Sequence, residues 1–369
     1  ARINDRARID NPDSPPPQPS HLSPIHSPMN ILVLGGTQFS GRSFVEQAVD
    51  AGHHLTILHR SPEAPGLPEG IRHLIGDRDP KDPDNKGDGL GAIKQLLDNG
   101  ERFDCVVDMC GYTPRVVRES CELLKDHTDL YLFVSTISVY PVSPDAQPSE
   151  DWAWEQLVQL DDEGVEEVTG ETYGGLKVLC EQVVHEYFPD NHIIPRPTII
   201  AGPHDPTDRV TWWTRALSTL DAVIIPEPPA GLAQFVDSRD LAAFFLKCIT
   251  ENITGTYNCA GPQPGLTLHQ FINQAHTALN SSTKLLEAPH AWFKEHDLNP
   301  SRDIPTWIPD EMQSVYKVDY SKALEAGLEN RPMGDTLRDV RAWDVDRGEP
   351  DLTAGMSFDR LQELVATHA

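Results

Sequence analysis

A tyrosine and a lysine lie four residues apart in the stretch "YGGLK", as Tyr173 and Lys177. Residues at this spacing share one face of a helix, so the two side chains would lie close together. A free phenol has a pKa of about 10, too high for a base at neutral pH, and a nearby ammonium lowers that pKa. The pair is therefore a candidate for moving a proton. The alternatives are an aromatic residue on a helix face and a solvated charge.

Thr136 offers a hydroxyl group upstream of this pair. It ends the apolar stretch "FVST", which is typical of a buried strand, and the helix that carries Tyr173 and Lys177 follows that strand. A hydroxyl there would orient a substrate oxygen while Tyr173 acts as general acid or base. Taken alone, Thr136 is an ordinary residue at a strand end. The three residues together predict a site that moves a proton to or from a substrate oxygen.

A glycine-rich loop joins an apolar strand to a helix in "ILVLGGTQFSG", residues 31–41. Such a loop presents backbone N–H groups and the positive end of a helix, which suits a pyrophosphate. Gly35 permits a tight turn, and Gly41 permits close packing of the helix on the strand. Gln38 stands where the middle glycine of such loops usually lies. The loop predicts a dinucleotide site that includes Gly35, Gly36, Thr37, Gln38, Phe39 and Gly41.

The ends of the next two strands bear on which dinucleotide is bound. An acidic residue commonly ends the second strand of an NAD-binding fold and holds the ribose 2′-hydroxyl. Here Arg60 takes that place, and an arginine would instead pair with a 2′-phosphate. The prediction is NADP, with NAD as the alternative, and a solvated loop arginine as the plain interpretation. Asp77, after the third strand, either accepts a hydrogen bond from the adenine amino group or caps a turn.

Strands rich in Val, Ile and Leu alternate with amphipathic helices over the first half of the chain, which predicts an α/β fold with a doubly wound parallel sheet of the Rossmann type. Ligands of such sheets bind at the carboxyl edge. The expected strands are residues 30–35, 53–60, 71–77, 103–110, 129–136 and 191–197, and the expected helices are 40–52, 91–99, 114–126 and 173–187.

The alternation ends near residue 204, which predicts a second, smaller and mixed lobe over the carboxyl edge of the sheet. The expected division is a disordered, proline-rich extension at 1–28, a dinucleotide-binding domain at 29–203 to which 233–262 returns, and a substrate-binding lobe at 204–369. Apart from a few helices and strands, this lobe is expected to be irregular. His204 and Arg209, with Asp205 between them, lie where the lobe meets the cleft. They contact substrate or form a turn and cap.

Composition excludes several classes of function. The formal net charge is −27, which disfavours nucleic acid and anionic membrane surfaces as partners. No apolar run approaches the roughly 18 residues that span a bilayer. The six cysteines form no CxxC pair, and the histidines have no metal-ligand spacing. Reduced, buried thiols in a cytoplasmic protein without a metal site are therefore expected.

These motifs resemble the extended short-chain dehydrogenases/reductases, and more narrowly the NAD-dependent epimerase/dehydratase group. The resemblance covers roughly residues 29–345 and is carried by "GGTQFSG", "FVSTISVY", "YGGLK", "RPTIIAGPHD" and "FVDSRDLA", in that order. It implies a Rossmann domain with a small C-terminal substrate domain, a catalytic triad at Thr136, Tyr173 and Lys177, and a nucleotide-sugar substrate. Lys177 would also bind the nicotinamide ribose. A homodimer is a further expectation from the resemblance.

The chain departs from this family in several places. "VVDMCG" replaces the usual strand end, so that Asp108, Cys110 and Gly111 would line the cofactor differently. Ile137 and Ser138 stand where the sugar 4,6-dehydratases have an acid and a base, which argues against dehydration. The segment between Thr136 and Tyr173 is long and acidic, as a lid or an inserted surface helix would be.

Two classes of function remain open from the sequence. The first is an enzyme, either an epimerase or a plain dehydrogenase/reductase. The second is a cofactor-binding sensor or regulatory protein on a degenerate scaffold of the same family, since some relatives with altered glycine loops have such roles. The complete triad favours the enzyme.

Overall fold

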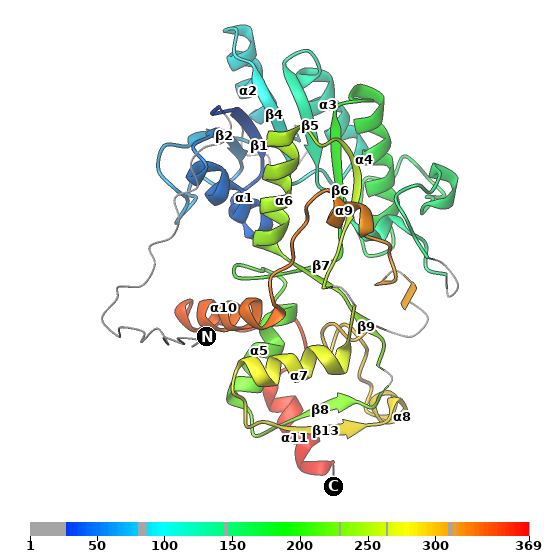
Figure 1. Cartoon of the computed structure of the whole chain (residues 1–369). Coiled ribbons are helices and arrows are strands. Elements are labelled where there is room, and N and C mark those ends of the chain that lie inside the picture. The colour runs from blue at the N-terminus through cyan, green and yellow to red at the C-terminus, as the bar shows by residue number, and fades with distance from the viewer. Residues whose placement is uncertain are drawn as a thin grey trace, which may run out of the picture.

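The computed structural model describes residues 27–79, 87–143, 147–228, 230–262, 265–308, 313–314 and 316–368. Residues 1–26 of the predicted extension lie outside this described part. Figure 1 shows two bodies, a larger one built around a central sheet and a smaller one that contains the C-terminus. The α/β fold expected from the sequence is confirmed.

The central sheet is parallel throughout and, within the described residues, has seven strands in the order β11-β6-β5-β4-β1-β2-β3. Apart from β11, this is the strand order 3-2-1-4-5-6 of dinucleotide-binding sheets. The strands are β1 (Asn30–Leu34), β2 (His54–His59), β3 (Arg72–Ile75), β4 (Phe103–Asp108), β5 (Thr128–Phe133), β6 (His192–Pro197) and β11 (Gly255–Cys259).

Helices cover both faces of the sheet, because alternate residues of each strand point to opposite faces. In β1, Ile31 and Val33 pack with Phe44 of α1 (Phe39–Asp50). Leu32 and Leu34 pack with Val117 on the other face. The first face carries α1 and α6 (Ser238–Glu251), and the second carries α2 (Gly89–Asp98), α3 (Pro114–Leu124) and α4 (Tyr173–Tyr187).

The smaller body has its own apolar core, in which Trp212 and Trp213 are fully buried. Its elements are α5 (Arg209–Thr219), β8 (Ala222–Pro226), α7 (Leu268–Ala278), β13 (Lys284–Ala288), α8 (His290–Glu295), α10 (Met333–Asp346) and α11 (Phe358–Thr367).

The expectation of a mostly irregular second lobe is wrong. The helix α7 follows a capping box in which Thr267 accepts a hydrogen bond from the Gln270 amide. Its buried residues Leu268, Phe271, Ile272 and Ala275 recur at helical spacing. The sequence therefore carries the signal for this helix, and the sequence analysis missed it.

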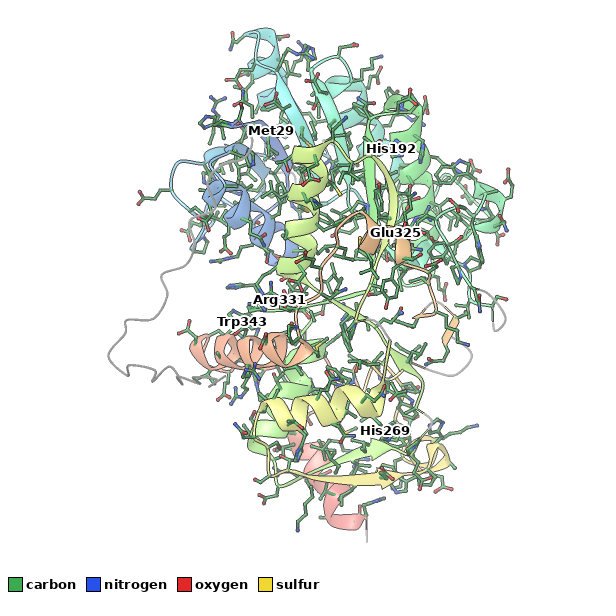
Figure 2. The ribbon with its side chains drawn as sticks, viewed as in Figure 1. Met29, His192, His269, Glu325, Arg331 and Trp343 are labelled. Carbon is green, nitrogen blue, oxygen red and sulfur yellow. The ribbon has the colours of Figure 1, made fainter. Side chains whose placement is uncertain are left out.

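Short strands and ion pairs connect the two bodies. β7 (Ile199–Ala201) pairs in parallel with β10 (Phe235–Asp237), and β9 (Leu232–Ala233) pairs antiparallel with β12 (Leu266–Thr267). The Arg331 guanidinium lies 2.7 Å from Asp240 at the start of α6. Figure 2 shows Arg331 between α6 and the helix α10, which carries Trp343. The division into domains at residue 203 stays a prediction, although β11 joins the central sheet and α6 packs on α1.

Candidate active site

A cavity of about 1700 Å³ opens at the carboxyl ends of β1, β2, β4, β5 and β6. The end of β1 and the start of α1 form one wall, and residues from the smaller body, among them Arg209 and Tyr316, form another. Most of the residues predicted for the site line this cavity: Gly35, Gly36, Thr37, Gln38, Phe39, Gly41, Arg60, Asp77, Cys110, Thr136, Tyr173, Lys177 and Arg209.

The glycine loop has the backbone conformation for which its glycines are needed. Gly35 and Gly36 have φ angles of +93° and +87°, which favour glycine. A Cβ atom on Gly36 would lie 2.8 Å from Cγ1 of Val33, and one on Gly41 would lie 2.7 Å from Cα of Gly36. The strand, the turn and the helix α1 are therefore in such close contact here that a side chain at Gly36 or Gly41 would not fit.

The helix α1 begins against the cavity without a cap. Gln38 is its N-cap residue and, among the described residues, makes no side-chain cap hydrogen bond. The first turn contains no acidic residue. Uncapped N–H groups and the positive end of the helix dipole therefore line the cavity through Gln38, Phe39 and Ser40, as an anion site requires.

Arg60 and Asp77 lie together just after the ends of β2 and β3. Nη1 of Arg60 is 3.6 Å from Oδ2 of Asp77. The arginine side chain is 63% exposed, whereas Asp77 is buried. Oδ1 of Asp77 accepts a hydrogen bond from the Asp79 amide, and Oδ2 has no hydrogen-bond partner within the described residues. A buried carboxylate oxygen in this state is suited to accept from a ligand N–H group.

Arg78 and Asp108 form a buried ion pair behind this wall, with Nη1 and Oδ1 2.6 Å apart. Arg78 also donates to Oγ of Ser120, and the Tyr131 hydroxyl donates to Asp108. Arg78 lines the cavity and places its Nη1 3.8 Å from Sγ of Cys110. The sequence analysis missed Arg78, and only the neighbouring charges in "GDRD" hint at it.

Lys177 is buried and firmly held. Its ammonium donates to the carbonyl oxygen of Gly111 at 2.8 Å and to that of Val134 at 2.6 Å. Gly111 therefore positions Lys177 rather than lining the cavity. A Cβ atom on Gly111 would lie 2.6 Å from the Phe133 ring. Two of the three ammonium hydrogens are used in this way, and one remains for another acceptor.

Thr136 and Tyr173 meet at the end of β5. Oγ1 of Thr136 accepts a hydrogen bond from the Ser138 amide at 3.1 Å, which caps a short 3₁₀ helix, η1 (Ile137–Val139). Burial raises the pKa of Tyr173, and a hydrogen bond with Thr136 and the positive charge of Arg209 lower it in part. The sequence argument assigned that lowering to Lys177. The structure assigns it to Thr136 and Arg209, because the ammonium is directed to the two carbonyl groups.

The loop before α5 separates the two predicted substrate residues. Arg209 lines the cavity. His204 lies outside the described lining, with its ring 5.4 Å from that of Trp343. Asp205 is 1% exposed and accepts hydrogen bonds from the amide and hydroxyl of Thr207, so it builds the turn. The structure therefore brings only Arg209 to the site.

The acidic segment before α4 borders the cavity through Val142, Val158, Val168 and Glu171. Between Thr136 and Tyr173, the described residues form two 3₁₀ turns, η1 (Ile137–Val139) and η2 (Trp154–Gln156), and no inserted surface helix. Val142 and Val168 are 49% and 46% exposed, and Tyr112, across the cavity, is 48% exposed. Tyr112, which the sequence analysis did not select, therefore contributes to an apolar rim.

Arg115 on α3 ties the acidic segment to the sheet. Its guanidinium bonds to both oxygens of Asp79, each at 3.0 Å, and to both oxygens of Glu166, at 2.6 and 3.1 Å. Asp79 follows β3 and lines the cavity, so Arg115 links the acidic segment to the loop after β3.

All six cysteines, which the structure describes in full, are free, and Cys110 alone is only half-buried. Among the described residues, no group of three or more His, Cys, Asp or Glu side chains could hold a metal ion. Within the same ranges, none of the helices is both long and apolar enough to cross a lipid bilayer.

Comparisons with known proteins place this fold. A scan against models of protein families finds no match. The chain is 26% identical over 240 residues to the chloroplast stem-loop binding protein of 41 kDa b of Arabidopsis thaliana, a match that covers 60% of this chain and 56% of that protein. The chain thus spans little more than half the length of the relative that it matches.

Solved structures of epimerases have the same fold. The Bordetella bronchiseptica enzyme WbmG, in complex with NAD and UDP, matches with a TM-score of 0.63 at 15% identity, over 91% of this chain and all of that chain. UDP-glucose 4-epimerase with UDP-glucose from Thermotoga maritima matches with a TM-score of 0.61 at 16% identity, over 87% of this chain and all of that chain. The protein has the fold of these two solved enzymes, and the α/β fold of the Rossmann type expected from the sequence is confirmed.

Proposed function

We propose that this protein is an NAD(P)-dependent oxidoreductase or epimerase of the extended short-chain type, which transfers hydride at a carbinol or ketone carbon of a small molecule. One observation carries the proposal. A single cavity is lined both by the glycine loop at the start of α1 and by Thr136, Tyr173 and Lys177 at the ends of β5 and α4. If the glycine loop only reversed the direction of the chain, we would not expect it to line the same cavity as Thr136, Tyr173 and Lys177.

The residues of the cavity fit a nicotinamide dinucleotide. The uncapped start of α1 would hold the pyrophosphate. Oδ2 of Asp77 makes no hydrogen bond among the described residues, lies 3.6 Å from Nη1 of Arg60, and would accept from the adenine amino group. Arg60, exposed at the end of β2, would pair with a 2′-phosphate, so NADP is the cofactor that we propose. NAD is the alternative, because the carboxylate of Asp77 lies beside that arginine. The enzyme WbmG, which has the same fold, was solved in complex with NAD.

When bound, the nicotinamide supplies the hydride acceptor or donor. Thr136 holds the reacting oxygen, and Tyr173 takes up or returns its proton. Lys177 is oriented by the carbonyl oxygens of Gly111 and Val134 and would hold the nicotinamide ribose through its remaining hydrogen. Thr136 and Arg209 act against the rise in the pKa of Tyr173 that burial causes. The residues that surround Tyr173 and Thr136, among them Lys177 and Arg209, therefore fix the positions from which these two act.

A nucleotide sugar is the substrate class that we propose, since a UDP-glucose 4-epimerase of this fold was solved with UDP-glucose and the enzyme WbmG with UDP. Net epimerisation requires the oxidised sugar to present its other face before reduction. A plain dehydrogenase or reductase releases it instead. The 4,6-dehydratase reaction is not part of the proposal, because Ile137 and Ser138 offer no acid and base. A homodimer and a cytoplasmic location stay predictions from the sequence.

The test is a calorimetric titration of the protein with NADPH and with NADH, followed by turnover assays of Tyr173→Phe on a panel of nucleotide sugars. We expect NADPH to bind more tightly. Loss of the phenol should lower turnover by about 10²- to 10⁴-fold and leave cofactor affinity unchanged. Tighter binding of NADH would replace NADP by NAD and leave the enzyme proposal intact. Binding of neither cofactor would overturn the proposal.

A second candidate is a cofactor-binding sensor or regulatory protein. It is favoured by the match to a protein named for stem-loop binding. The net charge of −27 argues against a nucleic-acid partner for this chain. Tyr173→Phe separates the two functions, because a sensor would keep its full response when the phenol is lost.

A further inference from the structure

Arg209 is unusual among the arginines of this acidic chain. Among the arginines that the structure describes, it alone has no ion pair with an aspartate or glutamate. The others each have at least one. The chain has 57 acidic residues and 30 basic ones, so an unpaired guanidinium is uncommon here.

The guanidinium of Arg209 is nevertheless fixed in place. Its Nε donates to Oγ1 of Thr207 at 3.0 Å, and that hydroxyl donates to Oδ1 of the buried Asp205 at 2.6 Å. Asp208, which precedes the helix with a φ of +53°, is held by Arg347 at 2.6 Å. The loop thus holds Nε of the Arg209 guanidinium. It leaves the two terminal nitrogens, Nη1 and Nη2, without a partner among the described residues.

Arg209 lines the same cavity as the proton-transfer residues. Arg209 lines the cavity together with Tyr173, Thr306 and Tyr316. Its charge is close enough to act on both phenols, because it lowers the pKa of Tyr173 and of Tyr316 against the rise that burial causes. Ser301, Thr306 and Tyr316 belong to the smaller body, where substrate specificity is expected to lie.

We propose that Arg209 is a specificity-determining residue that binds an oxyanion of the substrate, a carboxylate or a phosphate, beside the carbon that Tyr173 serves. This inference rests on the proposed function, since it names the substrate class of the same site. The planar guanidinium matches both groups through two parallel hydrogen bonds. A half-buried guanidinium that has given up part of its hydration and has no carboxylate partner gains most from such a ligand.

The test compares binding of matched ligands by calorimetry, to wild type and to Arg209→Gln, with saturating cofactor. Uridine against UDP isolates the phosphate, and UDP-glucose against UDP-glucuronate isolates the carboxylate. We expect wild type to prefer the anionic member of one pair, and Arg209→Gln to bind that member about 10- to 100-fold more weakly, with little change for the neutral member. The pair that responds identifies the oxyanion.

Two further variants keep the result interpretable. Arg360→Gln, an exposed arginine on α11, is the matched control and should bind every ligand as wild type does. Arg209→Lys keeps the positive charge without the planar pair of donors and should give an intermediate loss of affinity for the anionic ligand. It replaces Arg209→Gln if that variant does not fold. Equal binding of anionic and neutral ligands by wild type, or an unchanged preference in both Arg209 variants, overturns the inference.

The two proposals fail in distinguishable ways. Titration of wild type with NADPH and NADH tests the proposed function and does not involve Arg209. A protein that binds the cofactor and shows no Arg209-dependent preference contradicts only the role of Arg209. A protein that binds neither cofactor contradicts the function from which that role follows.

Discussion

Gly36 and Gly52 have nearly the same backbone conformation and very different surroundings. Their φ angles are +87° and +86°. A Cβ atom on Gly36 would lie 2.8 Å from Val33, whereas one on Gly52 would have nothing within 4 Å. Substitution at either position costs about 1–2 kcal/mol through the backbone, and at Gly36 the overlap adds to that cost.

We therefore predict that Gly36→Ala lowers the free energy of unfolding by roughly 2–4 kcal/mol and weakens cofactor binding, because the glycine loop must shift. Gly52→Ala should show only the backbone cost and bind the cofactor as wild type does. Chemical denaturation and cofactor titration of both variants measure this difference. Equal cofactor affinity in the two variants would contradict the role given to the loop.

Side chains that act through local spacing could be predicted from the sequence, and those that act through distant partners could not. Tyr173 and Lys177 are found by their helical spacing. The partner of Arg78 is Asp108, 30 residues away, and no pattern in the sequence joins them. His204 and Arg209 share one loop, yet left-handed residues at positions 204 and 208 turn the chain so that only Arg209 reaches the cavity.

The acidic segment before α4 is held in place by Arg115 rather than by secondary structure of its own. Arg115→Met removes the ion pairs to Asp79 and Glu166. Since a network of partly exposed pairs contributes about 1 kcal/mol, amide hydrogen exchange of residues 158–171 should become roughly five-fold faster. Mass-spectrometric exchange on intact protein measures this change.

The matched control for that experiment lies on the same helix. Arg118→Met removes an exposed ion pair to Glu186 on α4, which does not involve the acidic segment. Its exchange over residues 158–171 should equal that of wild type. Unchanged exchange in Arg115→Met would mean that apolar contacts, such as those of Leu157, hold the segment instead.

At the scale of elements, the sequence predicts regions with regular alternation well and short, interrupted ones poorly. The strands and helices of the central sheet follow from apolar runs of ordinary length. The acidic segment has no periodicity, so both a lid and a surface helix fitted its composition. In the smaller body, the strand β8 pairs with β13, which begins 58 positions after β8 ends. Such pairings depend on tertiary packing, which a local pattern does not encode.

The whole molecule should lose stability on acidification in two stages. Burial, and then the neighbouring His192, lowers the pKa of His185 to about 4. The unfolded chain therefore takes up this proton first, and stability falls as the pH drops from about 6.5 towards 4. Although burial opposes it, hydrogen bonds from Arg215 and Arg347 hold the pKa of Asp344 below its ordinary value. That contribution is complete above about pH 4 and is lost below it.

Asp344→Asn tests the second stage. Asp344 is fully buried and pairs with Arg215 at 2.6 Å, Arg347 at 2.9 Å and Arg341 at 3.3 Å. Its loss leaves the guanidinium of Arg215 without a carboxylate partner among the described residues, whereas Arg341 and Arg347 keep Glu349 and Asp208. The substitution should lower the free energy of unfolding by about 3–5 kcal/mol at pH 7. The variant should also lose less stability than wild type below pH 4. Denaturation curves from pH 3 to pH 8 measure both effects, and parallel pH profiles for the two proteins would contradict the assignment.

The place of β11 in the sheet has a consequence for how the protein is made. β6 ends at Pro197, and the strand that covers it begins at Gly255, after the chain has passed through part of the smaller body. During synthesis, six strands can leave the ribosome while β6 still presents an unpaired edge, to which another nascent chain could add. The interval between these two strands is therefore the period in which the growing chain is most exposed to aggregation.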